Sequence, residues 1–391
     1  MPIRRLLPIL SAAVLISCGP HRAQAPGSGV SPQQGPQGTG AVARGPELGK
    51  EYPSPDEAEQ TRRISDLFTA MTERKYPAGV RPMRRDAHTK AHACVQAEFT
   101  VGAAIPERAK LGLFKTAATY PAWIRFSNAF SSIQPDTEAD VKGMAIKVMG
   151  VEGEKLLERE KLETTQDFLL ISTNVFFSPN VSEYLKFTEE YVKNESTLRY
   201  VLWPPSHWRQ ARILYQASRV KITNPLTTRF WSSVPFKLGP AAVKYSAKPC
   251  GVAPDTGASG SSPNFLREAM VTTLRQGEAC FDFMVQFQSD PVKMPVEDPS
   301  VEWDENASPF VPVARVRVPK QTFDTERQVE YCENLSFTPW HSLPEHQPIG
   351  GVNRIRKTVY ERISTLRHAA NGAARDEPDG LTEFNAPVSP P

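Results

Sequence analysis

Residues 122–126 read Ala-Trp-Ile-Arg-Phe, a short β-prone run that is typical of the middle of this chain. Similar runs lie at residues 94–101, 144–148, 167–171, 280–287 and 312–318. The last two alternate apolar with polar side chains, as a half-buried strand does. The chain also has 36 Pro among 391 residues, which argues against a fully helical protein because an interior Pro ends or kinks a helix. We therefore expect a closed or nearly closed antiparallel sheet.

Three segments carry helical signals. Residues 54–57, Ser-Pro-Asp-Glu, form a capping box with Pro at the first helical position, and an amphipathic pattern follows. Its apolar residues are Ile64, Leu67, Phe68 and Met71. A second helix is predicted over residues 182–193 from the spacing of its aromatic residues, and a third between Ser262 and Gly277. Residues 251–262 are expected to form a flexible surface loop.

The amino terminus has the pattern of a secretory signal over residues 1–17, with a basic start and an apolar stretch half as long as a membrane span. The following Leu-Ile-Ser-Cys resembles a bacterial lipoprotein cleavage box, in which Cys18 would carry lipid. A plain signal peptide with a chance Cys is the alternative. Because Gly19 rather than Asp follows, the resemblance favours the outer membrane, facing the periplasm. Residues 18–53 are predicted to be a flexible tether, since half of residues 19–46 are Gly, Pro or Ser.

Charge and cysteine spacing exclude several kinds of function. The net charge is +3, which is too small to suggest a nucleic-acid partner, and no phosphate-binding glycine motif is present. Four cysteines remain after Cys18, at positions 94, 250, 280 and 332, and none has the spacing of a zinc site. They can pair as disulfides in an oxidising compartment, in a pattern that the sequence does not fix, or some can be small buried apolar residues.

The first chemical pattern is Arg-Asp-Ala-His-Thr-Lys-Ala at residues 85–91, just before a predicted strand. Histidine is the side chain best suited to proton transfer near neutrality, but a lone His88 is more often a structural residue. His92 lies four residues later. The two would share a face only on a helix, whereas this segment has the pattern of a strand, so a metal site formed by them is disfavoured.

The second and third patterns place arginines in unusual surroundings. Arg125 lies within an apolar strand, where it needs either a carboxylate such as Asp140 or an anionic cofactor group. Near the end of the chain, Arg356, Tyr360 and Arg367 would form one stripe of a helix. Arg356 would stabilise the phenolate of Tyr360, an anionic ligand for ferric iron. The alternative is an ordinary solvated basic face.

Taken together, the three patterns resemble the haem catalases and their smaller relatives. The resemblance includes the Arg-x-x-His-x-Lys context of His88, the Arg-Phe-Ser at residues 125–127, the Asp-x-Lys-Gly stretch from Asp140 and the Arg-x-x-x-Tyr of Tyr360. It spans residues 80–368. It implies an α+β fold, a catalase-like antiparallel β-barrel with surrounding helices and a C-terminal proximal haem-ligand helix. The implied haem domain covers residues 54–374, and residues 375–391 are expected to be a disordered tail.

The same resemblance implies a role for each site residue, with haem b as cofactor. Tyr360 would bind the iron with Arg356 as its partner, and Arg85, Arg125 and Arg367 would bind the propionates. His88 would move a proton between the peroxide oxygens, with Ser127 hydrogen-bonded to it. Phe176 and Tyr184 would line the distal face. The family has a distal Asn before the Phe-Phe pair, but here Asn174 is out of register, so either it reaches by a bulge or Ser172 replaces it.

Three functions remain open at this point. The resemblance favours a catalase or peroxidase that removes hydrogen peroxide at the cell envelope. A fatty-acid hydroperoxide-converting haem enzyme and a catalytically weak haem-binding lipoprotein are the alternatives. Oligomeric state and electron donor are not indicated by the sequence.

Overall fold

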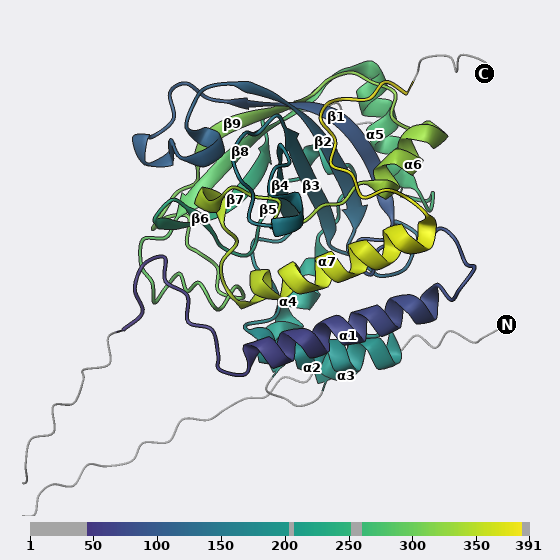
Figure 1. The fold of residues 1–391 in the computed structure, drawn as a ribbon, viewed down its shortest axis with the longest axis horizontal. Coiled ribbons are helices and arrows are strands. Elements are labelled where there is room, and N and C mark those ends of the chain that lie inside the picture. Colours follow the sequence, from purple (N-terminus) through teal and green to yellow (C-terminus); the bar gives the residue numbers. More distant parts are fainter. Residues whose placement is uncertain (1–44, 203–206, 252–259, 385–391) are drawn as a thin grey trace, which may run out of the picture. The chain divides into compact units, whose positions relative to one another are not determined.

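The computed structural model describes residues 45–202, 207–251 and 260–384 (Figure 1). The predicted signal, Cys18, most of the predicted tether, the middle of the predicted 251–262 loop and residues 385–391 lie outside this part. The strands are β1 Ala91–Val101, β2 Thr119–Asn128, β3 Lys142–Met149, β4 Thr165–Ile171, β5 Phe230–Trp231, β6 Phe236–Leu238, β7 Ala241–Pro249, β8 Ala279–Phe287 and β9 Val311–Val318. The α-helices are α1 Glu57–Lys75, α2 Val181–Asn194, α3 Leu198–Leu202, α4 Trp208–Arg219, α5 Phe265–Gln276, α6 Glu326–Asn334 and α7 Gly351–Asn371.

The strands form a closed antiparallel barrel. Their order is β5-β4-β3-β2-β1-β9-β8-β7-β6, and β5 also pairs with β7, which closes a ring of eight strands. Alternate residues of each strand fill the interior, as Ile124 does between Val95 and Ile146 of its neighbours. Phe99, Phe168 and Phe283 pack against one another in this core, with Phe99 and Phe168 stacked and Phe283 inclined to both. The expected antiparallel barrel with helices around it is confirmed.

Three helices form a layer against one side of the barrel. Figure 1 shows α7 running across the barrel with α1 beside it, and α2 contacts both of them. Their shared apolar surface includes Ile64 and Phe68 of α1, Leu185 of α2, and Ile355 and Val359 of α7. Burial of these side chains holds α7 at a fixed place beside β3 and β4. A pocket lies between α7 and these strands.

The sequence predicts most of the barrel strands but misses several other elements, long ones among them. All six expected strands are present, and the helices predicted after residues 54, 182 and 262 correspond to α1, α2 and α5. The capping box is wrong, because α1 begins at Glu57 and Asp56 makes no side-chain cap. The Glu57 carboxylate instead binds Arg354 on α7. The strand β7 was not predicted, because its buried Lys244 and Ser246 hide the apolar pattern.

Both ends of the predicted haem domain extend further than expected. Residues 375–384 are packed against the barrel rather than disordered: the Glu377 carboxylate pairs with the buried Lys147, and Phe384 contacts Trp123. At the other end, Gly49 N–H donates to Gln288 and Glu51 pairs with Arg354, so the tether ends before these residues. These side-chain contacts are long-range, and local composition carries no signal for them.

Four cysteines form two disulfides, Cys94–Cys332 and Cys250–Cys280. The first joins β1 to α6, and the second joins the end of β7 to β8. The pairing that the sequence left open is therefore settled in the structure. Among the described residues, no helix has the length and apolar character needed to cross a membrane.

Candidate active site

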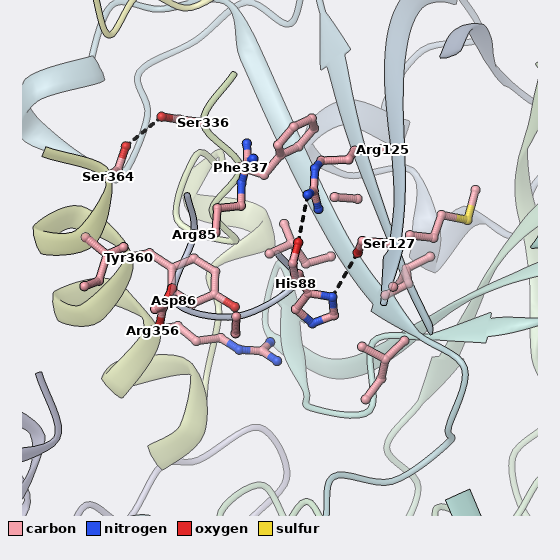
Figure 2. A pocket seen from close by; sticks show the side chains of 18 of the residues that line it. Arg85, Asp86, His88, Arg125, Ser127, Ser336, Phe337, Arg356, Tyr360 and Ser364 are labelled. Atoms are coloured by element: carbon pink, nitrogen blue, oxygen red, sulfur yellow. Dashed lines mark hydrogen bonds between the residues drawn. The ribbon is translucent and has the colours of Figure 1, made fainter. Parts of the chain in front are cut away.

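A pocket with a cavity volume of about 110 Å³ lies between the barrel and α7. Its barrel side is formed by the segment before β1 and by residues of β2, β3 and β4. Its other side is α7, which contributes Arg356, Tyr360, Ile363, Ser364 and Arg367. Figure 2 shows His88 and Tyr360 projecting toward the pocket from these opposite sides. We name this space the arginine pocket, for Arg85, Arg125, Arg356 and Arg367.

His88 is held in place by backbone and side-chain bonds. Its backbone has a left-handed φ of 56°, and its N–H donates to the carbonyl of Ala129. Its ring Nδ1 lies 3.0 Å from Ser127 Oγ (Figure 2). Burial, and after it the positive charges of Arg125 and Arg356, together lower the pKa of His88 to about 3. The imidazole is therefore neutral at physiological pH, and with Nδ1–H given to Ser127 its Nε2 is free to accept a proton.

Gly143 of β3 forms the wall against the His88 ring. A Cβ at this position would lie 2.6 Å from His88 Nδ1 and 2.9 Å from Ser127 Oγ. Any larger residue would therefore displace the imidazole. The sequence interpretation quoted Gly143 within a motif but gave it no role, since a close approach of this kind depends on the pairing of β2 with β3.

Tyr360 lies one helical turn from Arg356 on α7, as the sequence predicts. Burial raises the pKa of the Tyr360 phenol, and Arg356 lowers it only in part. The expected effect of Arg356 on the Tyr360 pKa is present, but the loss of hydration outweighs it, so the pKa is raised overall. A cation close to the phenol oxygen would be needed to stabilise the phenolate.

The arginines of the pocket have few carboxylate partners. Arg85 pairs with Glu333 at 2.9 Å. Arg125, which is 3% exposed, donates to the carbonyl of His88 at 2.7 Å, while its Nε has no hydrogen-bond partner among the described residues. In that same part of the chain, no carboxylate lies within 4.0 Å of Arg125, Arg356 or Arg367. Buried cations without anions are costly, so the pocket has the charge of an anion-binding site.

Asp140, the alternative partner for Arg125, binds elsewhere. Its carboxylate accepts from the backbone N–H groups of Ala129 and Phe130 at 2.8 and 3.1 Å. These bonds fix the turn that receives His88 N–H. Asp140 is therefore not the partner of Arg125, and an anionic cofactor group beside Arg125 stays a prediction.

A second, larger pocket adjoins the first and shares Asp86, His88, Arg356 and Tyr360 with it. It has a cavity volume of about 340 Å³ and is lined mainly by apolar and aromatic side chains, which include residues of α1, α2, α4 and α7. Phe176 and Tyr184 lie in its wall with their rings 5.6 Å apart. We name this space the aromatic pocket. It is the apolar approach to His88.

Asn174 lies in neither pocket. Its amide donates to Glu302, and it lines a small separate cavity beside Lys244. Ser172 Oγ accepts from the backbone N–H of Lys142 at 2.9 Å and does not line the pockets. The structure thus corrects both suggestions for a distal amide or its substitute, because the chain between β4 and α2 turns these side chains away from His88.

Asp86 is a site residue that the sequence interpretation missed. It lines both pockets next to His88, and burial raises the pKa of its carboxyl to about 6, against the effect of Arg85. Its position in the sequence between Arg85 and His88 could have identified it. The second histidine of that motif, His92, binds Asn128 at 2.8 Å within the barrel wall, so the two histidines do not form a metal pair.

Comparisons with known proteins identify the fold. A fungal catalase matches with 17% identity and a TM-score of 0.56, over 77% of this chain and 65% of that one. Catalase A from Saccharomyces cerevisiae matches with 18% identity and a TM-score of 0.56, over 77% and 67%. A bacterial catalase matches with 16% identity and a TM-score of 0.55, over 90% and 70%. The chain therefore spans about two thirds of the length of these catalases.

The fold of the chain is catalase-like. No protein-family model and no curated protein sequence matches it. The likeness is therefore one of structure, at a sequence identity too low to transfer an activity.

Proposed function

We propose that this protein is a haem-dependent enzyme that decomposes peroxides. The observation that carries the proposal is the opposition of a neutral His88 and Tyr360 across a pocket with three guanidiniums that no carboxylate contacts among the described residues. The catalase-like fold supports it. Haem b has one metal that a tyrosine can bind and two carboxylates that arginines can bind.

The residues of the arginine pocket fit this cofactor. Tyr360 would bind the iron, with Arg356 beside it. Arg125 and Arg367, which have no carboxylate partner among the described residues, would bind propionates together with Arg85. The bound iron would supply the electron transfer that peroxide decomposition requires. Gly143 leaves the room that this arrangement needs on the His88 side.

The residues on the barrel side would handle the protons. His88 Nε2 would accept the proton of the peroxide oxygen nearer the iron and return it to the farther oxygen as the O–O bond breaks. Its low pKa keeps it unprotonated and ready to accept. Ser127 would hold the ring through Nδ1, and Phe176 and Tyr184 would keep the approach apolar.

One observation favours a second candidate substrate. Asn174 and Ser172 face away from the pockets. Neither side chain can therefore take the place of the amide that orients hydrogen peroxide in the family. The aromatic pocket, by contrast, has room and apolar lining for an organic hydroperoxide. Conversion of organic hydroperoxides is therefore the second candidate, and a haem-binding lipoprotein with weak turnover is the third.

The place of action is also a proposal. A lipoprotein attached through Cys18 to the outer membrane, facing the periplasm, would act at the cell envelope. The two disulfides support an oxidising compartment.

The test is an absorption spectrum of the protein supplied with haem, followed by oxygen release and hydroperoxide consumption. Tyr360→Phe should change the spectrum and lower both activities. Tyr331→Phe is the matched control, because Tyr331 packs against Trp123 outside the pockets. Oxygen from hydrogen peroxide would support the catalase form of the proposal, and consumption of organic hydroperoxides alone would support the second candidate. Failure to bind haem would overturn the enzyme proposal.

A further inference from the structure

The helix α4 exposes an unusual surface. Its outer stripe consists of Trp208, Arg212, Tyr215 and Arg219, at positions i, i+4, i+7 and i+11. Trp208 is 73% exposed and Tyr215 is 56% exposed, and within α4 only Gln210 is buried. Two large aromatic side chains on one exposed stripe are rare on a free protein surface and mark an interaction site.

The same region is strongly basic. Residues 196–254 contain nine Lys and Arg and no Asp or Glu, and of the nine, Arg199, Arg209 and Arg229 pair with carboxylates of other segments. Arg212 and Lys221 are exposed, and neither has a carboxylate within 4.0 Å in the described part of the chain. Arg219 lies over the ring of Tyr215. The outer face of α4 is thus an aromatic and cationic surface, in which Arg212, Arg219 and the adjoining Lys221 have no carboxylate partner among the described residues, whereas Arg209 at its edge pairs with Asp298.

The inner face of α4 belongs to the aromatic pocket. Ile213, Leu214 and Ala217 line that pocket, which reaches His88 and Tyr360 at its other end. One helix therefore separates an apolar cavity from the exposed basic and aromatic surface. A ligand whose apolar chain enters the cavity, and which comes from an anionic surface, would match both faces of α4.

We propose that the outer face of α4 binds the surface of an anionic lipid membrane, and that the aromatic pocket receives the acyl chain of a lipid taken from it. Trp and Tyr are favoured at the headgroup level of a bilayer, and Arg and Lys are attracted to anionic lipids. The pocket then serves the proposed peroxide chemistry, and this second half rests on the proposed function. The membrane contact itself does not.

A second copy of the chain fits this surface less well. A two-fold interface would place α4 against itself, so that Arg212 and Lys221 would face like charges without a carboxylate nearby. The lipid surface supplies the opposite charge and an apolar layer for Trp208.

The membrane contact can be tested with vesicles of phosphatidylcholine alone or with about a third phosphatidylglycerol. Residues 46–391 form one compact unit with its own core and both disulfides, so they can be used without the predicted lipid anchor. Binding should be stronger to the anionic vesicles and weaken with salt. Arg212→Gln with Lys221→Gln should weaken it about 30-fold, which corresponds to about 1 kcal/mol per charge.

Aromatic contact needs its own variant and control. Trp208→Ala with Tyr215→Ala should weaken vesicle binding, and brominated lipids should quench wild-type fluorescence more than that of Trp208→Phe. The control is Lys115→Gln with Leu162→Ala, which changes one exposed cation and one apolar side chain that is 87% exposed, both far from α4 in sequence. Equal binding of all variants would overturn the proposal. Self-association that is lost in the aromatic variant, without vesicle binding, would instead assign α4 to an interface between copies and also overturn it.

Occupation of the aromatic pocket is tested separately with a hydroxy fatty acid, which has no O–O bond to react. It should displace a fluorescent fatty acid from the wild-type protein, and Ala217→Phe, which fills the inner face of α4, should weaken this binding at least tenfold. Vesicle binding of Ala217→Phe should remain. If the protein binds vesicles and fatty acid but no haem, the proposed function fails while the membrane contact stands. If neither ligand binds, the membrane proposal fails regardless of haem.

Discussion

Two buried histidines, His88 and His341, have opposite electrostatic surroundings. Burial and nearby arginines lower the pKa of His88 to about 3. Burial and Lys147 also act to lower the pKa of His341, but Glu377 and Asp167 outweigh them and raise it to about 9. Depth alone therefore does not decide the charge of a histidine here. The charges built around it do.

The charged groups around His341 have partners of opposite charge within the fold. We name this group the ion-pair cluster; its members are Lys147, Glu160, Asp167, His341, Arg375 and Glu377. Three carboxylates meet one lysine, one arginine and a protonated histidine, so each buried charge has an opposite partner, and Arg375 also pairs with the partly exposed Glu361. Glu160, His341 and Glu377 are close enough to hold a metal ion. Because Lys147 and Arg375 already neutralise the carboxylates, we assign no metal to them.

Around His88, by contrast, buried arginines lack carboxylate partners among the residues that the structure describes. The two regions are neighbours on the outer face of β3, where Gly143 and Ala145 line the arginine pocket and Lys147 belongs to the ion-pair cluster. In the pocket, Arg125 and Arg367 are buried without a carboxylate within 4.0 Å in the described residues. The difference indicates that the ion-pair cluster supports the fold and that the arginine pocket is suited to an anionic ligand.

The largest expected effect is in the ion-pair cluster. Lys147→Met should destabilise the protein by about 3–5 kcal/mol, because the buried Asp167 and Glu377 would keep only His341 as a neighbouring cation among the described residues. Urea unfolding measures this. Lys186→Met is the control: Lys186 pairs with Glu183 but is 57% exposed, so its loss should cost under about 1 kcal/mol. Equal costs for the two variants would mean that the cluster does not depend on its charges.

The pH dependence of stability should show the raised pKa of His341. A group whose pKa is higher in the folded state stabilises the fold below its unfolded pKa of 6.5, and this contribution is lost as the pH rises to about 9. The loss is on the order of 3 kcal/mol. Subtracting the profile of His341→Gln removes the other titrating groups, including Lys244, whose buried side chain has its pKa lowered to about 7. If the difference in the free energy of unfolding between the two proteins does not change from pH 6.5 to 9, the raised pKa of His341 is contradicted.

The sequence predicted the arginine pocket far better than the ion-pair cluster, for a physical reason. The pocket residues lie in short motifs, and each motif has a chemistry that needs those residue types close together. The cluster members are spread from Lys147 to Glu377, over strands, a turn and the C-terminal segment, and each looks ordinary in its local sequence. Only the pairing of β3 with β4 and the path of residues 375–384 bring them together.

The same reasoning explains the parts of the fold that were missed. The strands with apolar runs were predicted because their outer faces are also covered, by helices or by the pocket. The strand β7 was missed because Lys244 is buried beside Trp303, a tertiary contact that no local pattern reveals. Asn174 was placed in the site by its position before Phe176, and the turn that sends its amide to Glu302 has no sequence signal that we recognised.

A smaller effect is expected from the geometry of His88. Gly143→Ala would push a methyl group against the imidazole and should reduce peroxide decomposition up to about 100-fold, as a misplacement of about 1 Å can. Its effect on the free energy of unfolding should be about 1–3 kcal/mol. The control is Gly277→Ala, since a Cβ there meets no described atom within 4 Å. Unchanged peroxide kinetics in Gly143→Ala would show that the position of His88 does not limit the rate.

The smallest effect on stability is expected from Arg125→Met, measured without haem. The substitution loses the hydrogen bond to His88 O, but it also removes a buried cation whose pKa is lowered by burial and by Arg85. The two changes oppose each other, so unfolding in urea should shift by under about 1 kcal/mol. The same variant should hold haem less tightly, because one anion-binding group is gone. If Arg125→Met costs as much stability as Lys147→Met, then Arg125 is a structural charge like Lys147, and the contrast between the two regions fails. If it costs little and haem retention falls, the cation of the pocket exists for a ligand rather than for the fold.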